Sequence, residues 1–102
     1  MARSTRHLYT GVGSGVHRQN FNWGPIRKAS AVLITAAEWR TLVSGVERPN
    51  LNEKNIVWVT NIGPHDDEGG GAGGVEFLLH ASLPPDHQID VMCTFTVLGD
   101  VE

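Results

Sequence analysis

The sequence predicts an all-β fold, an antiparallel β-sandwich of about six strands, and three observations carry this prediction. Apolar residues recur with a period of two, most clearly in the last run, 89–99. β-Branched residues dominate the runs 30–36 and 55–62, and clusters of Gly, Pro and Asn separate the runs. The sequence has no internal repeat of about 20 to 50 residues, which excludes solenoids and propellers.

The length and composition predict one β-sandwich domain over residues 1–102. The chain has 102 residues, of which 40% are hydrophobic, enough for a single modest core. The formal net charge is −3, and acids and bases interleave over most of the chain, so we expect no nucleic-acid partner. No apolar run is long enough for a membrane span.

The N-terminal stretch MARSTRHLYTG lacks the apolar core of a signal peptide. We therefore expect a cytoplasmic location by default, although export without a leader would leave no mark in the sequence. The one cysteine, Cys93, has no partner for an internal disulfide, and its apolar surroundings predict a small buried thiol.

The first predicted strands follow in order along the chain. A short strand opens it at 7–13, HLYTGVG. Aromatic and amide residues then alternate through FNW until Gly24-Pro25 breaks the run. A β-branched strand follows at 30–36, SAVLITA, and another at 55–62, NIVWVTNI.

The segment AAEWRTLVSGVER, 36–48, is ambiguous. Residues 36–43 are long enough for two helical turns, but Gly45 and Pro49 would stop a helix quickly. We interpret the segment as the end of a strand followed by a long loop, with a short helix as the alternative.

The last two runs alternate most regularly. On one face of each run, the sequence places Val75, Phe77, Leu79 and Ala81, and Ile89, Val91, Cys93, Phe95 and Val97. The opposite faces carry apolar residues as well, among them Leu78, Met92 and Leu98. The proline-rich LPPDHQ between the runs predicts that they form an antiparallel pair.

The stretch PHDDEGGGAGGVEF, 64–77, combines a histidine, three acids and many glycines. A Walker-type phosphate loop is excluded because the glycines lead into a strand and no Lys-Ser/Thr pair follows. His65, Asp66, Asp67 and Glu68 offer ligands to a divalent cation, but no calcium or zinc motif is present. We interpret the run as a connector and predict no metal, a mobile Gly69–Gly74 segment, and a fold that survives its shortening.

A hydrolase of the catalytic-triad kind would need a histidine and an acid close to a serine. His80 lies on the less apolar face of its predicted strand and could approach Asp86 or His87 near the following turn. No GxSxG elbow is present, however, and Ser14 precedes a predicted strand rather than a helix. We therefore predict no catalytic residue and no cofactor.

The stretch FNW offers a sugar-binding surface, because Asn22 supplies an amide beside the aromatic ring of Trp23. The alternative is that Trp23 belongs to the core or to an interface. Trp39 has the same two interpretations, and Trp58, in the middle of a strand, is predicted to be a core residue.

From about residue 8 to 101 the chain resembles the H-type lectin domain, the small six-stranded sandwich of snail agglutinins and of the discoidin C-terminal domain. The resemblance rests on the order of the segments LYTGVG, RKASAVLITAAEW, NLNEKNIVWVTNIGP, VEFLLHA and IDVMCTFTVLGD. It implies a non-catalytic carbohydrate-binding module that assembles as a homotrimer or a larger oligomer.

The resemblance also implies site residues. In the family the third segment begins with an Asn-Leu and a basic sugar-contacting residue and ends in a Pro-Gly turn. Asn50-Leu51 or Asn52, Lys54 and Gly63-Pro64 stand in those places. Asp86 and His87 are the nearest equivalents of the aromatic residue and histidine of the family's last hairpin.

The sequence therefore predicts a carbohydrate or glycoconjugate ligand bound through end loops, with self-association. The predicted ligand-binding residues are Lys54, Asp86, His87, Trp23 and Asn22. A structural or protein–protein interaction subunit of a larger assembly is the alternative, and a small metal-dependent hydrolase using His65, Asp66, His80 or His87 is a third.

Overall fold

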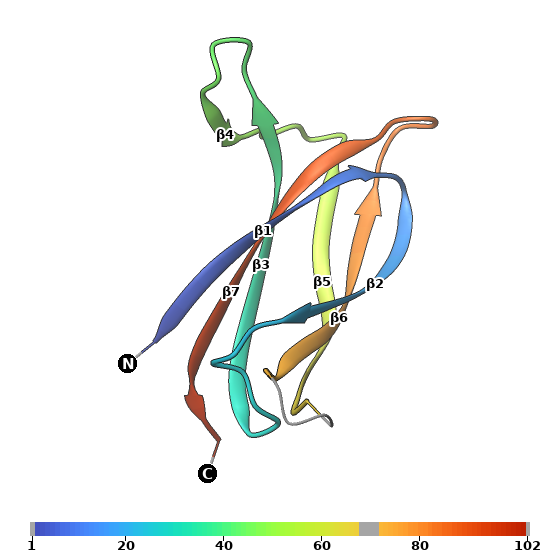
Figure 1. Ribbon diagram of the computed structural model, residues 1–102. Coiled ribbons are helices and arrows are strands. Elements are labelled where there is room, and N and C mark those ends of the chain that lie inside the picture. Colours follow the sequence, from blue (N-terminus) through green and yellow to red (C-terminus); the bar gives the residue numbers. More distant parts are fainter. Residues whose placement is uncertain (1, 68–71, 102) are drawn as a thin grey trace.

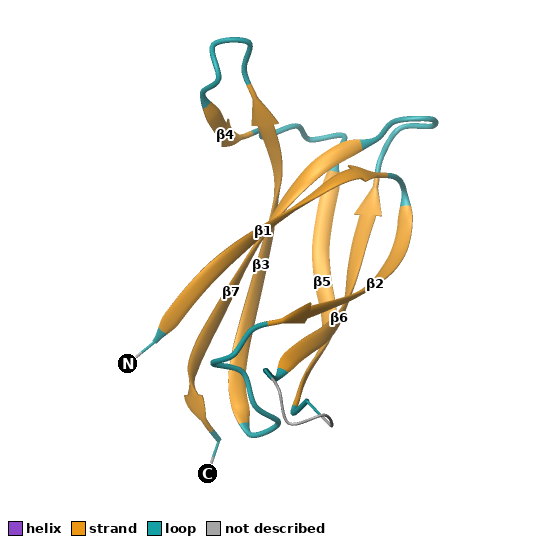
Figure 2. Cartoon of the chain, in the orientation of Figure 1, coloured by secondary structure: helices purple, strands orange, loops and turns teal. Residues whose placement is uncertain are grey.

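The computed structural model of the chain describes residues 2–67 and 72–101. These residues contain strands and no helix, and none of them forms a helix that could cross a membrane (Figure 2). The predicted all-β class is confirmed. Seven strands are present in the described residues: β1 (Arg3–Val12), β2 (Gly15–Asn22), β3 (Ser30–Thr41), β4 (Glu47–Pro49), β5 (Ile56–His65), β6 (Gly74–Ser82) and β7 (Ile89–Asp100).

The strands form two antiparallel sheets that pack into a sandwich, as predicted (Figure 1). One sheet has four strands in the order β1-β7-β3-β4, and the other has three in the order β2-β6-β5. The central strands β6 and β7 are neighbours in sequence but lie in different sheets. The short strand β4 is one that the sequence analysis did not predict.

The core lies between β6 and β7, and the predicted inward faces of these strands are confirmed. Their alternation turns every second side chain inward, where the two sheets exclude water from it. The rings of Phe77 and Phe95 meet edge to face with centroids 5.5 Å apart, and Phe21 stacks on Phe95 at 4.1 Å. Ile26, from the connection between β2 and β3, is fully buried in the same cluster. The inward residues of the two central strands that are buried are Val75, Phe77, Leu79, Ala81, Val91, Cys93, Phe95 and Val97.

The predicted antiparallel pairing of the last two runs is wrong. β6 pairs with β2 and β5, whereas β7 pairs with β1 and β3. The intervening residues 83–88 therefore cross from one sheet to the other instead of closing a hairpin. With neighbours on both sides and in different sheets, β6 and β7 bury their apolar faces against each other, which a hairpin of the two would not do.

The prediction that Trp58 is a core residue is also wrong. Val57 and Val59 turn toward the core and pack against it, so Trp58 faces outward with 43% of its surface exposed. The Trp58 ring stacks on the imidazole of His80, with centroids 4.9 Å apart. The smaller valines fill the narrow space between the sheets, and the indole packs on the outer surface of its own sheet.

The ambiguous segment forms a hairpin, which we call the arm (residues 39–49). β3 continues to Thr41, and three register pairs join its end to β4. The helix alternative is therefore wrong, and the loop is shorter than predicted. A turn between Leu42 and Val46 closes the arm, with Gly45 at a φ of +87°. The arm extends beyond the rest of the sandwich at the top of Figure 1.

Part of the glycine-rich run is packed, contrary to the predicted mobile connector. Gly73 is buried, and its carbonyl oxygen accepts a hydrogen bond from the backbone N–H of Trp23. A Cβ atom on Gly73 would lie 1.9 Å from the carbonyl oxygen of Ile26, and one on Gly74 would lie 2.7 Å from that of Phe21. Of the predicted mobile segment, Gly69–Gly71 lie outside the described residues, as does Glu68.

β5 also runs further than predicted. It extends to His65, so Gly63 and Pro64 belong to a strand that pairs with β6 and do not form a turn. A register shift between Thr60 and Gly63, with Asn61 at a φ of 55°, bends the strand before this last part.

We expect Gly73→Ala to lower the free energy of unfolding by about 2 kcal/mol or more, because the added methyl group overlaps the backbone of the 23–30 connection. Urea unfolding followed by circular dichroism measures the loss. Gly13→Ala is the matched control, since a Cβ there meets nothing within 4 Å. An equal effect of the two substitutions would show that Gly73 is not closely packed.

Candidate ligand-binding site

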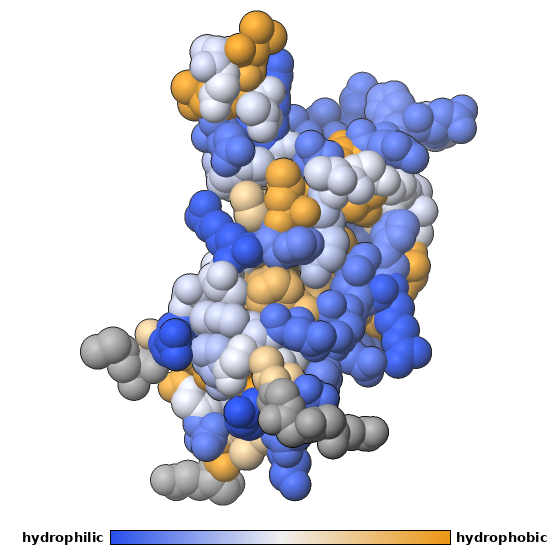
Figure 3. All heavy atoms as spheres, in the orientation of Figure 1, coloured by the Kyte–Doolittle hydropathy of each residue, from blue (hydrophilic) through white to orange (hydrophobic). Residues whose placement is uncertain are grey.

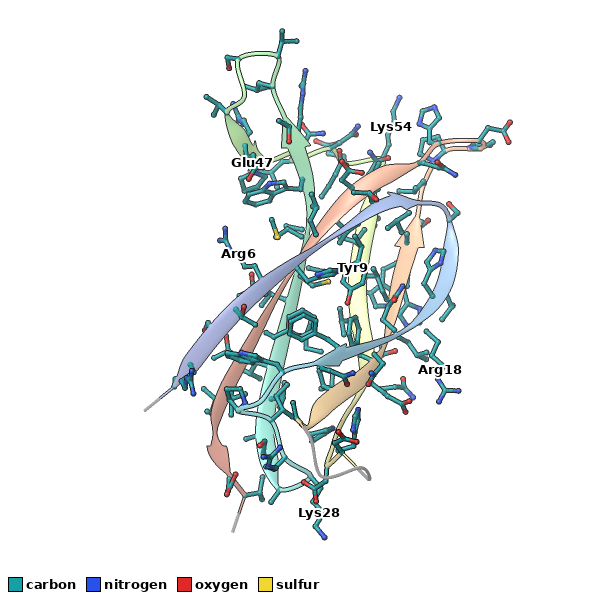
Figure 4. All side chains as sticks on the ribbon, viewed as in Figure 1. Arg6, Tyr9, Arg18, Lys28, Glu47 and Lys54 are labelled. Atoms are coloured by element: carbon teal, nitrogen blue, oxygen red, sulfur yellow. The ribbon has the colours of Figure 1, made fainter. Side chains whose placement is uncertain are left out.

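The predicted ligand-binding residues fall at two ends of the sandwich. Lys54 lies two residues before β5, whose first residue pairs with the last of β6, and Asp86 and His87 follow β6. Asn22 pairs with the first residue of β6, Gly74. The length of β6, roughly 26 Å at 3.3 Å per residue, separates the two groups. We call the end formed by residues 13–14, 50–55 and 83–88 the loop end; Figure 4 shows Lys54 there and Lys28 at the opposite end.

Asp86 and His87 lie in a tight turn on the loop end. The backbone N–H of His87 donates to the carbonyl of Pro84 at 3.2 Å, and Asp86 has a φ of 63°. Ser14, in the neighbouring turn, donates its hydroxyl to the Leu83 carbonyl and accepts from the Leu83 N–H. The two turns border a shallow hollow of about 350 Å³ that includes Asp86 and His87 but not Lys54.

The most organised polar group on the loop end is centred on Glu38. Glu38 pairs with buried Val91 and so points between the sheets. Its carboxylate accepts hydrogen bonds from the side-chain amide of Asn55, at 2.7 Å, and from that of Asn50. The backbone N–H of Asn50 also donates to the Glu38 carbonyl at 2.9 Å. Hydrogen bonds to an ionised acceptor are among the strong ones, so this group fixes residues 50–55 against β3.

Two hollows meet at Glu38 and Asn50. The first, of about 560 Å³, lies beside the 50–55 loop and is also lined by Leu51 and Asn55. The second, of about 390 Å³, lies toward the arm, and its other polar lining residues are Trp39, Arg40, Thr41, Gln88 and Asp90. Both volumes are in the range of small-ligand sites, and carboxylate, amide and apolar groups converge on them.

Two buried polar atoms border these hollows without a hydrogen-bond partner among the described residues. They are the indole Nε1 of Trp39 and the side-chain oxygen of Asn55. The guanidinium of Arg6 lies 5.3 Å from the centroid of the Trp39 ring, which fixes the indole from the outer face of the sheet. Buried donors and acceptors nearly always have a hydrogen-bond partner. These two buried atoms without one therefore mark the hollows beside them as candidate sites.

The opposite end places Asn22 in a polar cluster and Trp23 outside it. Asn20 donates to the Asn22 side-chain oxygen at 2.9 Å, and the Nε2 of His65 lies 2.7 Å from the Asn20 oxygen. Asn22 and His65 line a hollow of about 680 Å³, whereas Trp23 is half-buried and packs against the core. The guanidinium of Arg3 lies over the Trp23 ring, 5.8 Å from its centroid.

The residues proposed for a metal site have other partners. The Nδ1 of His65 lies 2.9 Å from the Asp66 carbonyl oxygen, and the Asp66 carboxylate accepts from the backbone N–H of Lys28 at 3.0 Å. In residues 2–67 and 72–101, no three His, Cys, Asp or Glu side chains are grouped so that they could hold a metal ion. Glu68 falls outside those ranges.

His80, the residue on which the hydrolase alternative depends, contacts neither of its expected partners. Its Nε2 lies 2.6 Å from the Thr60 hydroxyl, and its ring stacks on Trp58. Asp86 and His87 extend beyond the end of β6 in a turn of their own. Among the described residues the structure thus places a hydroxyl and an imidazole on an open sheet face, without the acid that completes a triad.

Comparisons of the chain with protein-family models, with curated proteins and with solved structures gave no match. The resemblance to H-type lectins therefore stays a prediction.

Glu38 and Asn55 are the site residues that the sequence analysis missed. The inward positions of β3 run Val32, Ile34, Ala36, and the next one is Glu38. An acid in an inward position of an otherwise apolar strand must find hydrogen-bond donors, and that break in the alternation is the signal that identifies it. No comparable signal identifies Asn55, because its role depends on where the 50–55 loop folds.

Cys93 lies in the core of the folded protein. Its side chain is fully buried, as predicted, and burial raises the pKa of the thiol from its ordinary 9.0 to about 12. The neighbouring Tyr9 also has its pKa raised, to about 12, by burial and then by the charge of Cys93.

We expect Cys93 not to react with Ellman's reagent at pH 8 in the native protein and to react fully in guanidinium chloride. Because the unfolded thiol ionises near 9.0 and the folded one near 12, the contribution of this thiol to stability should be constant below about pH 9 and fall between pH 9 and 12. Absorbance at 412 nm and thermal melts across that range measure the two effects. Rapid labelling of the native chain would show that the thiol is accessible.

Proposed function

We propose that this chain is a non-catalytic carbohydrate-binding module of the H-type-lectin kind, which binds its ligand at the loop end. The observation that carries the proposal is the Glu38 carboxylate, held by the amides of Asn50 and Asn55 where two hollows meet.

The chemistry of this group suits a polyhydroxyl ligand. Sugar hydroxyls donate to carboxylate and amide oxygens and accept from amide N–H groups. The hydrogen bonds to Glu38 hold its carboxylate in one position, so little freedom is lost when a ligand binds. Leu51, which is 98% exposed, and Ile56 offer apolar surface beside the amides for the C–H face of a sugar ring.

The resemblance to H-type lectins points to the same segment. Its sugar-contacting stretch corresponds to residues 50–54, which belong to the loop that Glu38 fixes. Lys54, in the place of the family's basic residue, is exposed at the loop end (Figure 4). Asp86 and His87 line the neighbouring hollow and extend the proposed binding surface. Asn22 and Trp23, at the opposite end, are not part of the proposed site.

The second candidate function is a protein-interaction or assembly subunit, and the outer face of the three-stranded sheet favours it. The register of β2 and β5 on β6 determines which side chains lie on this face. The exposed apolar residues on this face are Val16 (60%), Ile56 (55%) and Trp58 (43%). The tip of the arm is apolar too, with Val43 and Val46 exposed (Figure 3). A homotrimer or larger oligomer would cover such surface and would multiply a weak sugar site by avidity.

We expect Glu38→Gln to weaken glycan binding about tenfold or more, because the substitution removes the ionised acceptor for sugar hydroxyls. The measurement is a glycan array followed by calorimetry with the best ligand, with and without chelator. Asp100→Asn is the matched control, since it removes one exposed carboxylate at the opposite end of β3 and β7.

Equal affinities of parent and Glu38→Gln would remove this site from the proposal. A blank array with a folded parent protein would favour the interaction subunit instead. Lys54→Ala tests how far the binding surface extends along the loop end.

We expect Val16→Glu to reduce the native mass, measured by light scattering, to the 11.1 kDa of one chain. A charge buried against a partner without a counter-ion is costly, so the assembly should dissociate. Leu33→Glu is the control, because Leu33 is 55% exposed on the outer face of the other sheet. A parent protein that is already monomeric, or an identical response of the two variants, would contradict assembly through this face.

A further inference from the structure

The arm carries two arginines at directly opposed positions. Arg40 of β3 pairs in register with Arg48 of β4, and both side chains are exposed. β4 has β3 as its one neighbour in the sheet, so this part of the arm is a two-stranded ribbon. Like charges placed directly opposite on neighbouring strands destabilise the pairing.

No acid of the described chain neutralises this pair. Neither guanidinium forms an ion pair or hydrogen bond with a described residue; the one exposed ion pair that involves an arginine joins Arg18 to Glu76 on the other sheet. Glu47 pairs with Thr41 and so points to the opposite face of the arm from Arg48.

Glu38 is the acid placed to form an ion pair with Arg40, because it lies two residues earlier on β3 and on the same face of that strand. Its carboxylate is instead engaged by the amides of Asn50 and Asn55. The acid that would neutralise the arm is thus held in the floor of the hollow, and the two guanidinium groups keep their donors free.

We propose that Arg40 and Arg48 bind an oxyanion, the carboxylate or sulfate group of an acidic sugar whose ring lies in the adjacent hollow; this rests on the proposed function. Arg40 lines the hollow of about 390 Å³ together with Glu38, Trp39, Asn50, Gln88 and Asp90. Guanidinium groups present paired N–H donors that match the geometry of carboxylate and sulfate oxygens.

The charges around this hollow give the ligand a direction. Arg40 lies toward the arm, and Glu38 lies on the same face of β3, further from the tip of the arm. Asp90 pairs with Trp39, so its carboxylate points to the other face of the sheet, where it accepts from the backbone N–H of Gly11 at 3.3 Å. An oxyanion is attracted to the arginines of the arm and repelled by the carboxylate of Glu38, whereas sugar hydroxyls donate to that carboxylate. The arrangement therefore selects a sugar with one acidic substituent over a neutral one and over a sugar that carries several acidic groups.

The experiment is a set of calorimetric titrations at constant ionic strength with galactose, galactose 6-sulfate, galacturonic acid and sodium sulfate. We expect the two acidic sugars to bind the parent at least about tenfold more tightly than galactose. The reason is that an arginine guanidinium forms charge-assisted hydrogen bonds with the carboxylate or sulfate of the sugar. Arg40→Gln and Arg48→Gln should each remove that preference. Arg27→Gln, which removes one exposed arginine at the opposite end of β3, should keep it.

The outcomes separate this inference from the proposed function. Equal affinities for galactose and galactose 6-sulfate, unchanged in Arg40→Gln, would overturn the oxyanion site and leave a neutral-sugar lectin. Binding of sulfate alone, lost in Arg48→Gln, would support the oxyanion site while contradicting the carbohydrate function. No binding of sulfate or of either acidic sugar would overturn the inference. Thermal melts of the variants confirm folding, and relief of the like-charge pair should leave their stability equal to or above that of the parent.

Discussion

The contact between the inner faces of β6 and β7 is the constraint on which the rest of the structure depends. β6 is the central strand of the three-stranded sheet and β7 is an interior strand of the other, and their facing side chains form most of the buried core. Every other strand of the sandwich pairs with one of them, apart from the short β4. The edge-to-face contact of Phe77 and Phe95 joins the sheets at the centre, and Phe21 from β2 stacks on the same pair. Edge strands and loops take their positions from this core.

The loop end gains its order from one departure from the apolar pattern. Glu38 occupies the inward position that follows Ala36 on β3, paired with buried Val91. Its carboxylate cannot remain between the sheets without donors, and Asn50 and Asn55 supply them. The same hydrogen bonds fix the 50–55 loop, line two hollows with polar groups, and leave the arginines of the arm without an acid. One partly buried carboxylate thus accounts both for the local structure and for its proposed capacity to bind a ligand.

The alternation of apolar residues predicted which face of each strand is buried, because that property depends on neighbours along the chain. It did not predict which strands pair: β6 and β7 have the pattern of a hairpin and instead belong to different sheets. An alternating strand carries the same pattern whichever strand it pairs with, and the six residues 83–88 can cross between sheets as readily as they can turn. Trp58 shows a related limit, since the face that turns inward was decided by the fit of Val57 and Val59. The close approach of Gly73 to Ile26 is a tertiary contact without a local signal. For the same reason the sequence indicated the 50–54 segment only through a family resemblance, and it did not indicate a partner for Glu38.

The most direct test of the proposed binding site is a titration of the isotope-labelled protein with its best glycan, followed by the side-chain amide resonances of asparagine in nitrogen–proton correlation spectra. We predict that the resonances of Asn50 and Asn55 shift first and furthest, because their amides border the proposed site with Glu38. The resonances of Asn20 and Asn22 should remain unchanged, since these residues lie at the other end of the sandwich. The reverse pattern would move the binding site to the cluster around His65 and would contradict a role for Glu38 in ligand binding.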